Sequence, residues 1–165
     1  TLNPVEEDEF IDKDLTMRDY LSEIILSFKE ISKKKFIFNF DQFSNVKKIT
    51  KSIEIVYGLR NFIGNANKFS KNSIYINLKS DSEFTEITIE DDGNGYPKDV
   101  LSKIGEPYLR SNDPIDKSKT GLGLGLFIGK TLLEKNFASI NCRNSKTRTG
   151  AEVIIKWNNK DLFNI

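Results

Sequence analysis

At 165 residues, with 38% hydrophobic and 30% charged residues, the chain has the size and composition of a single globular domain. The formal net charge of +1 provides no basic field for nucleic acid, and no apolar run approaches the roughly 20 residues of a membrane helix, so neither partner is expected. Histidine is absent and Cys142 is the sole cysteine, which excludes histidine-based catalysis, an internal disulfide and a zinc site.

The N-terminal third is expected to contain an acidic lead-in, a helix and a strand. Residues 1–15 lack a clear period and are interpreted as a lead-in, the end of a preceding domain. Thr16 and Asp19 have the spacing of a capping box, and apolar residues at helical spacing then predict a helix over 16–32. Alternating phenylalanines predict a strand at 35–40.

A second helix is predicted at 50–70, and it has two distinct faces. Its apolar residues fall on one face, whereas Asn61, Asn65 and Lys68 fall together on the opposite one. Asparagine is a middling helix former, and a carboxamide oxygen suits Mg²⁺ while a nearby lysine suits phosphate. The alternative is an ordinary solvated polar face.

Two strands at 73–78 and 83–91 are predicted to form a hairpin. Asp91 has the same parity as the core-facing isoleucines of its strand, so its carboxylate needs a hydrogen-bond donor. An adenine amino group is one such donor, and Gly93 and Gly95 would make room for the ring. The alternative is a plain Asp/Gly turn at the end of a strand.

The segment after this hairpin combines a short helix at 97–104 with a stretch without period at 105–120, which is typical of a functional lid. A glycine-rich turn then leads into a helix predicted at 124–135. Glycines at a helix N-terminus are suited to a phosphate group, although a flexible turn before a core helix would give the same pattern.

The last third is expected to hold two strands, at 138–143 and 151–157, and a tail at 158–165. Cys142 lies in the first of these strands and is interpreted as a buried, inert thiol.

Four sequence boxes and a closing strand motif resemble, in order and spacing, those of one ATPase domain. This domain is shared by sensor histidine kinases, DNA gyrase, heat-shock chaperone ATPases and MutL repair proteins. The motifs are an asparagine box at 61–69, a D-x-G-x-G box at 91–95, a box at 105–111 with Gly105 where phenylalanine is common, a G-x-G-L-G-L box at 121–126 and a closing motif at 149–153. The resemblance covers about residues 16–157, which would be the ATP-binding catalytic domain.

The resemblance implies a two-layer α/β sandwich, the Bergerat fold, with a mixed, mostly antiparallel sheet, about three helices on one face and a mobile ATP lid. It also implies ATP and Mg²⁺ as ligands, with Asn65 on the metal and Asp91 on the adenine amino group. The catalytic set that it implies is Asn61, Asn65, Lys68 and Arg110. The nucleotide-binding set is Asn65, Lys68, Phe69, Asp91, Gly93, Gly95, Ile104, Gly121, Leu122, Gly123, Leu124 and Gly125.

Within this superfamily the chain most resembles sensor histidine kinases, and in particular the RegB-type redox-responsive kinases. Hydrolysing relatives carry a glutamate base where Asn61 stands. The resemblance implies transfer of the γ-phosphoryl group to a histidine on a separate dimerisation domain, with a response regulator as the indirect partner. It further implies a homodimeric full-length protein and a cytoplasmic location for this domain. The alternatives are an anti-sigma-type serine kinase and a nucleotide-gated binding module without transfer activity.

Overall fold

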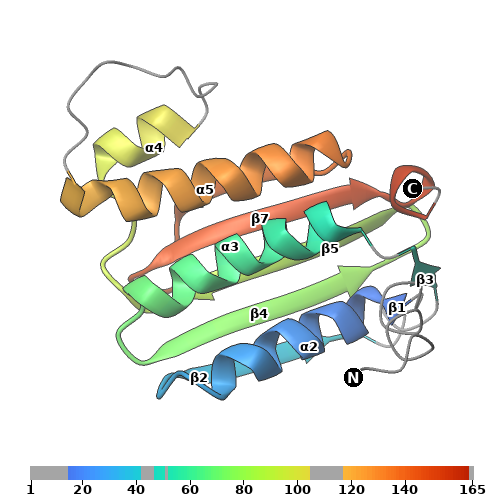
Figure 1. The fold of residues 1–165 in the computed structure, drawn as a ribbon, viewed down its shortest axis with the longest axis horizontal. Coiled ribbons are helices and arrows are strands. Elements are labelled where there is room, and N and C mark those ends of the chain that lie inside the picture. Colours follow the sequence, from blue (N-terminus) through green and yellow to red (C-terminus); the bar gives the residue numbers. More distant parts are fainter. Residues whose placement is uncertain (1–14, 42–46, 51, 105–116, 164–165) are drawn as a thin grey trace, which may run out of the picture.

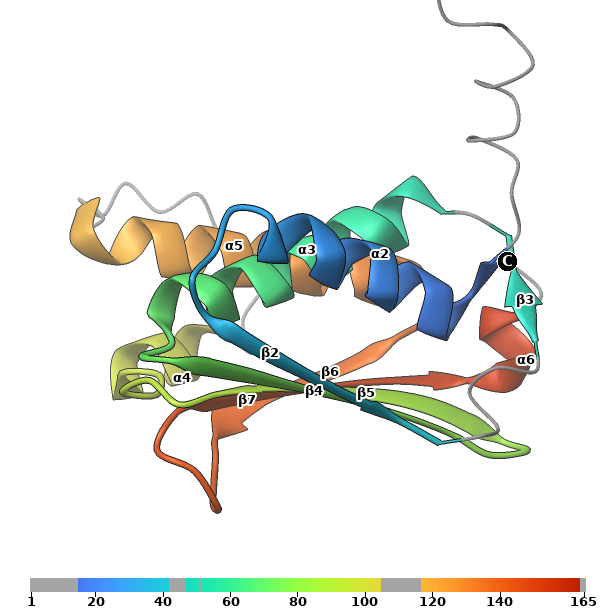
Figure 2. The same ribbon diagram turned by 90° about the horizontal axis from the view of Figure 1, so that it is seen from below.

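The computed structural model describes residues 15–41, 47–50, 52–104 and 117–163. In chain order the elements are β1 (Leu15–Thr16), α2 (Met17–Lys29), β2 (Lys35–Phe40), β3 (Lys48–Ile49), α3 (Ile53–Phe69), β4 (Ser73–Ser80), β5 (Phe84–Asp91), α4 (Lys98–Ile104), α5 (Lys117–Lys135), β6 (Ser139–Asn144), β7 (Ala151–Asn158) and α6 (Asn159–Leu162). Helices α2, α3 and α5 lie side by side over one face of the main sheet (Figures 1 and 2). The predicted two-layer α/β sandwich is therefore confirmed.

The main sheet has five strands in the order β2-β4-β5-β7-β6. Strands β2 and β4 run parallel, and the other three pairings are antiparallel, so the sheet is mixed and mostly antiparallel, as predicted. Strands β1 and β3 form a separate two-stranded sheet that was not predicted. Strands of two residues are too short to carry an alternating pattern.

Helices α2 and α3 begin where their capping residues place them. The hydroxyl of Thr16 accepts the backbone N–H of Asp19, and the Asp19 carboxylate accepts the N–H of Thr16, which is the predicted capping box. At α3 the hydroxyl of Ser52 accepts the N–H of Ile55. These caps satisfy N–H groups that the first helical turn leaves unpaired.

The core lies between the sheet and the helices. On β4 and β5 the alternate residues that face the helices are buried, including Ile76 and Ile87, each with an exposed fraction of 0%. Leu59 and Ile63, one turn apart on α3, are also at 0% and meet them from the helical layer. Burying such apolar side chains is the main driving force for this arrangement.

Helices α3 and α5 approach closely because glycines face the neighbouring helix. An ideal Cβ on Gly58 would lie 2.6 Å from Cγ of Leu133, and one on Gly129 would lie 2.8 Å from Cε2 of Phe62. Neither position has room for a side chain. This close approach also brings Gly125 of α5 beside Asn65 of α3.

The start of α5 differs from the prediction. The helix begins at Lys117 rather than at 124, so the glycines of the second glycine box lie inside it and not in a turn before it. Glycine disfavours a helix by only about 1 kcal/mol relative to alanine, and packing against α3 outweighs that cost. Of the expected lid at 105–120, residues 117–120 are helical and residues 105–116 lie outside the described part of the chain.

The C-terminal segment also contains structure beyond the last strand. Within 158–165, which was expected to be a tail, α6 forms and the Leu162 side chain is buried with an exposed fraction of 1%. The hydrophobic core thus extends past residue 157.

Candidate functional site

A pocket of about 240 Å³ lies at the end of β5 that carries Asp91, between α3, α4 and the beginning of β7. Its lining is predominantly apolar, with asparagine and aspartate as the polar side chains. The lining residues are Phe62, Asn65, Ala66, Phe69, Ile89, Asp91, Asn94, Gly95, Tyr96, Pro97, Val100, Ala151 and Val153. An apolar cleft with a few convergent polar groups is the usual form of a small-molecule site.

Asp91 supplies a buried carboxylate to this pocket. Its exposed fraction is 4%, which agrees with the core-facing parity predicted from its strand. Oδ1 accepts the backbone N–H of Gly93 at 2.8 Å and that of Ala151 at 3.4 Å. Because a carboxylate has about four acceptor sites, it retains capacity for a donor on a ligand.

Burial raises the pKa of the Asp91 carboxyl above its usual value, and the neighbouring Asp92 charge acts in the same direction. The hydrogen bonds from Gly93 and Ala151 oppose this shift without cancelling it. The ionised form of the Asp91 carboxyl group is therefore less well stabilised here than it would be in water. A ligand that donates a hydrogen bond to it would stabilise this form.

Glycines next to Asp91 allow the backbone to pack without gaps. An ideal Cβ on Gly93 would lie 2.1 Å from the carbonyl oxygen of Phe69, and one on Gly150 would lie 2.0 Å from that of Asp91. Gly95 has a φ of +79°, which favours glycine. The first glycine box and the glycine of the closing motif therefore shape the wall of the pocket.

The turn after α3, which positions Phe69, is held from two sides. The Lys34 ammonium group donates to the carbonyl oxygens of Asn67 and Ser70 at the end of the helix. The Asp92 carboxylate accepts three successive backbone N–H groups, those of Lys71, Asn72 and Ser73. Burial raises the pKa of the Asp92 carboxyl, but these hydrogen bonds outweigh burial and hold the pKa below its usual value.

Asn65 contributes a second polar group to the pocket, from the seam between α3 and α5. Within the described residues its Nδ2 atom is buried without a hydrogen-bond partner. An ideal Cβ on Gly125 would lie 3.0 Å from both Nδ2 and Oδ1 of Asn65, so glycine there leaves space for this amide. A buried amide without a partner is costly, and a polar ligand in the pocket would supply one.

Rotation of the Asn65 amide exchanges its oxygen and nitrogen, so it can present a ligand to a cation or a donor to a phosphate. A carboxamide oxygen is a ligand that suits Mg²⁺ when phosphate oxygens complete its coordination, so the chemistry of Asn65 fits such an ion. Among the described residues no group of three or more Asp, Glu, Cys or His side chains forms a protein-only metal site. A metal here would therefore depend on oxygen ligands from a bound molecule.

Several predicted site residues do not line the pocket. The Asn61 amide donates to the Tyr57 carbonyl oxygen of its own helix at 2.7 Å. Lys68 is exposed, with Nζ 5.3 Å from the centroid of the Phe69 ring, and Ile104 lies at the end of α4. The pocket instead brings together Asn65, Phe69, Asp91 and Gly95, with Gly93 directly behind its wall.

Gly125 of the second glycine box lies beside Asn65, but neither it nor the other members of the box are among the pocket-lining residues. Leu124 has an exposed fraction of 48%, and no described residue lies within 4 Å of an ideal Cβ on Gly123. Gly121 and Leu122 belong to α5, and Arg110 lies outside the described residues. The roles predicted for these residues remain predictions.

Sequence reasoning missed Tyr96 and Val100, which form the wall opposite α3. Tyr96 is buried, and burial raises the pKa of its hydroxyl well above the usual value. Burial likewise raises the pKa of the neighbouring Cys142 thiol to about 12, so this thiol is protonated at neutral pH. That result agrees with the interpretation of Cys142 as an inert side chain.

Comparison with known proteins connects this pocket to one family. Residues 50–161 match the family described as histidine kinase-, DNA gyrase B-, and HSP90-like ATPase. The sensor histidine kinase RegB of Cereibacter sphaeroides is 36% identical over 119 residues, which cover 63% of this chain and 26% of RegB. The sensor histidine kinase CpxA of Escherichia coli is 29% identical over 87 residues, which cover 53% of this chain and 19% of CpxA.

Solved structures share the fold. The catalytic domain of the histidine kinase ThkA superposes with a TM-score of 0.69 at 18% identity, covering 89% of this chain and 96% of that chain. Full-length ShkA in complex with AMPPNP gives a TM-score of 0.68 at 17% identity, covering 88% of this chain and 30% of that chain. The match to RegB spans about a quarter of that kinase's length. No helix among the described residues is long and apolar enough to cross a membrane.

Proposed function

Because the chain belongs to the histidine kinase-, DNA gyrase B- and HSP90-like ATPase family, we propose that it binds Mg·ATP and transfers the γ-phosphoryl group to a histidine on a separate dimerisation domain. The similarity to RegB supports a histidine kinase ATPase domain within this family. One observation carries the proposal. A single pocket combines the buried Asp91 carboxylate with the half-buried Asn65, whose Nδ2 atom is buried and has no partner in the described part of the chain.

In this proposal Asp91 selects the base. Its carboxylate accepts a hydrogen bond from the exocyclic amino group of adenine, at a position where guanine has a carbonyl oxygen. Losing a charge-assisted hydrogen bond of this kind costs about 1.5–3 kcal/mol. The apolar walls formed by Ala66, Phe69 and Val153 would contact the faces of the ring.

Asn65 would hold Mg²⁺ together with the phosphate oxygens, since a carboxamide oxygen is a suitable ligand for that ion. Bound Mg²⁺ supplies neutralisation of the charge on the triphosphate. Lys68 lies three residues after Asn65 and is exposed, so its flexible side chain is free to reach phosphate oxygens. We assign the same role to Arg110. We also propose that the backbone at Gly121, Gly123 and Gly125 contacts the triphosphate.

Transfer to another protein domain fits the chemistry of this chain better than hydrolysis. Asn61 stands where the hydrolysing relatives have a glutamate, and a carboxamide cannot accept a proton at neutral pH. The chain has no histidine that could accept a phosphoryl group. Phosphoryl transfer needs mainly positioning and charge neutralisation, and the imidazole of the acceptor is its own nucleophile.

By analogy with sensor histidine kinases, we extend this proposal to the partners of the domain. The acceptor would be the dimerisation domain of the same full-length protein, which would act as a homodimer and pass its phosphoryl group to a response regulator. We place the domain on the cytoplasmic side, where ATP is available.

The test is a labelling experiment with ATP that carries a radioactive γ-phosphate. The isolated chain should stay unlabelled, and the matching dimerisation domain, once added, should become labelled on histidine. Asn65→Ala should abolish the label, whereas the matched change Asn141→Ala, at an exposed position on β6, should not. Rapid ATP hydrolysis by the isolated chain, or label on its own serine or threonine residues, would contradict the proposal.

A further inference from the structure

The connection between β6 and β7, residues 144–151, lies at the face of the sheet opposite the helices (Figure 2). It nevertheless contacts both edges of the pocket. Most of these contacts join residues that are far apart in the sequence, so the sequence boxes do not reveal them. They suggest a role for this connection in shaping the base-binding site.

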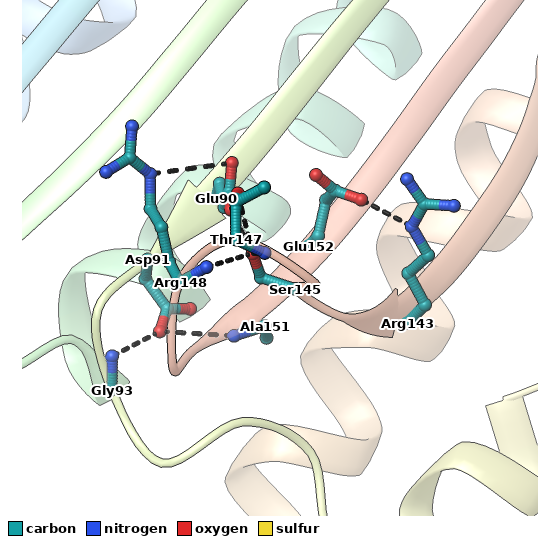
Figure 3. A network of polar contacts seen from close by, with 9 residues as sticks. All are labelled: Glu90, Asp91, Gly93, Arg143, Ser145, Thr147, Arg148, Ala151 and Glu152. Atoms are coloured by element: carbon teal, nitrogen blue, oxygen red, sulfur yellow. Dashed lines mark hydrogen bonds and ion pairs between the residues drawn. The ribbon is translucent and has the colours of Figure 1, made fainter.

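On the outer face of the sheet the connection is attached to Glu90, the residue before Asp91. The Ser145 hydroxyl donates to the Glu90 carboxylate, and the Arg148 guanidinium lies 3.7 Å from it (Figure 3). Arg148 also stacks on the Tyr75 ring, 3.5 Å from its centroid. Because Glu90 and Asp91 are neighbours on β5, these contacts fix the strand directly behind the pocket.

Further along, the connection reaches Asp91 and Asp92 themselves. The Thr149 hydroxyl donates to the carbonyl oxygen of Asp92 at 3.2 Å. The Ala151 N–H donates to Oδ1 of Asp91 at 3.4 Å, as Figure 3 shows. Gly150 packs on the Asp91 carbonyl group with no room for a Cβ. This end of the connection therefore holds the carboxylate edge of the pocket.

The other end of the connection holds the part of the pocket wall formed by Gly95 and Tyr96, through Asn144. The backbone N–H of Tyr96 donates to Oδ1 of Asn144 at 2.6 Å, and Nδ2 of Asn144 donates back to the carbonyl oxygen of Tyr96 at 3.2 Å. One side-chain amide thus satisfies both polar groups of a peptide segment, as a neighbouring strand would. Tyr96 and the preceding Gly95, with its φ of +79°, line the pocket.

Asn144 and Ala151 are paired across the β6–β7 ladder. A single rung of the sheet therefore links the Gly95–Tyr96 wall, through Asn144, to the Asp91 carboxylate, through Ala151. We propose that Asn144 is a positioning residue that sets the distance between this wall and Asp91, and thereby determines selectivity for adenine over other bases. The inference rests on the proposed binding of ATP in this pocket.

Removing the Asn144 side chain leaves the N–H and carbonyl groups of Tyr96 without these partners, so the wall moves relative to Asp91. Asn65 lies on a different element, α3, and is not part of this rung, so its proposed contacts with metal and phosphate should be retained. The variant should therefore lose affinity through weaker recognition of the base, while recognition of the triphosphate is unchanged.

Calorimetric titrations of the chain with Mg·ATP and Mg·GTP test this inference. Asn144→Ala should weaken ATP binding about tenfold, the factor that corresponds to a lost hydrogen bond or two, and should leave binding of Mg·GTP within about twofold. Asn144→Asp retains the acceptor for the Tyr96 N–H and should recover part of the ATP affinity. Asn141→Ala on the same strand serves as the matched control and should change neither affinity.

An equal loss of ATP and GTP affinity in Asn144→Ala would indicate a merely structural role and would overturn the inference, as would unchanged affinity for ATP. If Asn144→Ala does not fold, the ratio of the two affinities in Asn144→Asp decides: a ratio equal to that of the unchanged chain contradicts the inference. Failure of the unchanged chain to prefer ATP would refute the proposed function instead.

Discussion

The two ends of the candidate nucleotide site differ in how completely they are built. At the base end, an ideal Cβ would lie 2.1 Å from another backbone atom at Gly93 and 2.0 Å from one at Gly150. At the proposed phosphate end, no described residue lies within 4 Å of the corresponding position on Gly123, and Leu124 is 48% exposed. Among the described residues, glycine is thus sterically required at Gly93 and Gly150 but not at Gly123.

This difference suggests that the base end is preformed, whereas the glycines of the second box serve a different backbone conformation. In the structure these glycines lie inside α5, where each costs about 1 kcal/mol relative to alanine and brings no steric benefit at Gly123. A requirement for glycine would arise if the backbone left the helix to contact a triphosphate. Substitutions at the two ends test this contrast, in decreasing order of the effect that we expect.

The largest effect is expected at Gly150. The Cβ in Gly150→Ala would meet the Asp91 carbonyl group, and forcing the strands apart should lower the free energy of unfolding by about 3 kcal/mol. Chemical denaturation measures this change, with Gly123→Ala as the matched glycine-to-alanine control. A loss below about 1 kcal/mol would show that the base end is not tightly packed.

The next effect concerns Asp91→Asn. Replacing the charged acceptor should weaken the binding free energy of ATP by about 1.5–3 kcal/mol and should reduce the difference in affinity between ATP and GTP. Because burial raises the pKa of Asp91, its ionised form is unfavourable in the folded chain, so the variant without nucleotide should be no less stable than the unchanged chain. Calorimetry and thermal unfolding measure the two quantities, with Asp161→Asn on α6 as the control. If the variant still preferred ATP over GTP to the same extent, Asp91 would not be the residue that recognises the base.

Gly123→Ala should have opposite effects on stability and on binding. Without nucleotide the new methyl group meets none of the described residues, and the helix should gain about 1 kcal/mol in the free energy of unfolding. Affinity for Mg·ATP should fall, because the stabilised helix resists the backbone change that phosphate contact requires. Unchanged affinity together with raised stability would mean that α5 stays helical when nucleotide binds.

The smallest effect is a pH dependence that separates two adjacent carboxyl groups. The pKa of Asp92 is lowered in the folded chain, so its contribution to stability is present above the unfolded-state pKa of about 3.9 and is lost as pH falls through the folded-state pKa. The pKa of Asp91 is raised, so its contribution has the opposite sign: it is present below the unfolded-state pKa and is lost as pH rises through the folded-state pKa.

Asp92→Asn should therefore make the loss of stability in acid shallower, and Asp91→Asn should make it steeper. Denaturant midpoints measured at a series of pH values from about 3 to 7 test this, since that range includes the reference pKa of an aspartate, about 3.9. If both variants changed the pH dependence in the same direction, the two carboxyl groups would not contribute with opposite signs.

Much of the fold could be predicted from the sequence, because its strands and first two long helices carry strong local patterns. The alternation in β5 placed Asp91 on the buried side, and the Thr16 capping box marked the start of α2. The start of α5 could not be predicted in the same way. Its glycine-rich part is a poor helix by local propensity, and the helix there depends on packing against α3, where Gly125 lies beside Asn65, which the local sequence does not show.

Some motif residues, such as Asn65 and Asp91, line the pocket, whereas the contacts made by residues distant in the sequence could not be predicted. The pairing of Asn144 with Tyr96 spans 48 positions in the sequence, and no periodicity reports a contact of that kind. The motif placed Asn65 in the site, but only the structure shows that its amide is buried beside Gly125. Asn61, from the same motif, instead donates to its own helix.

The central claim is that Mg·ATP occupies the pocket with its base at Asp91 and its phosphates at Asn65. A nuclear magnetic resonance titration of the isotope-labelled chain tests it most directly. Mg·ATP should shift the backbone signals of Gly93 and Gly95 together with the side-chain amide of Asn65, whereas Mg·tripolyphosphate should shift the Asn65 amide and leave Gly93 and Gly95 unchanged. Shifts confined to the outer face of the sheet, for example at Asn141, or no response of the Asn65 amide to either ligand, would contradict the claim.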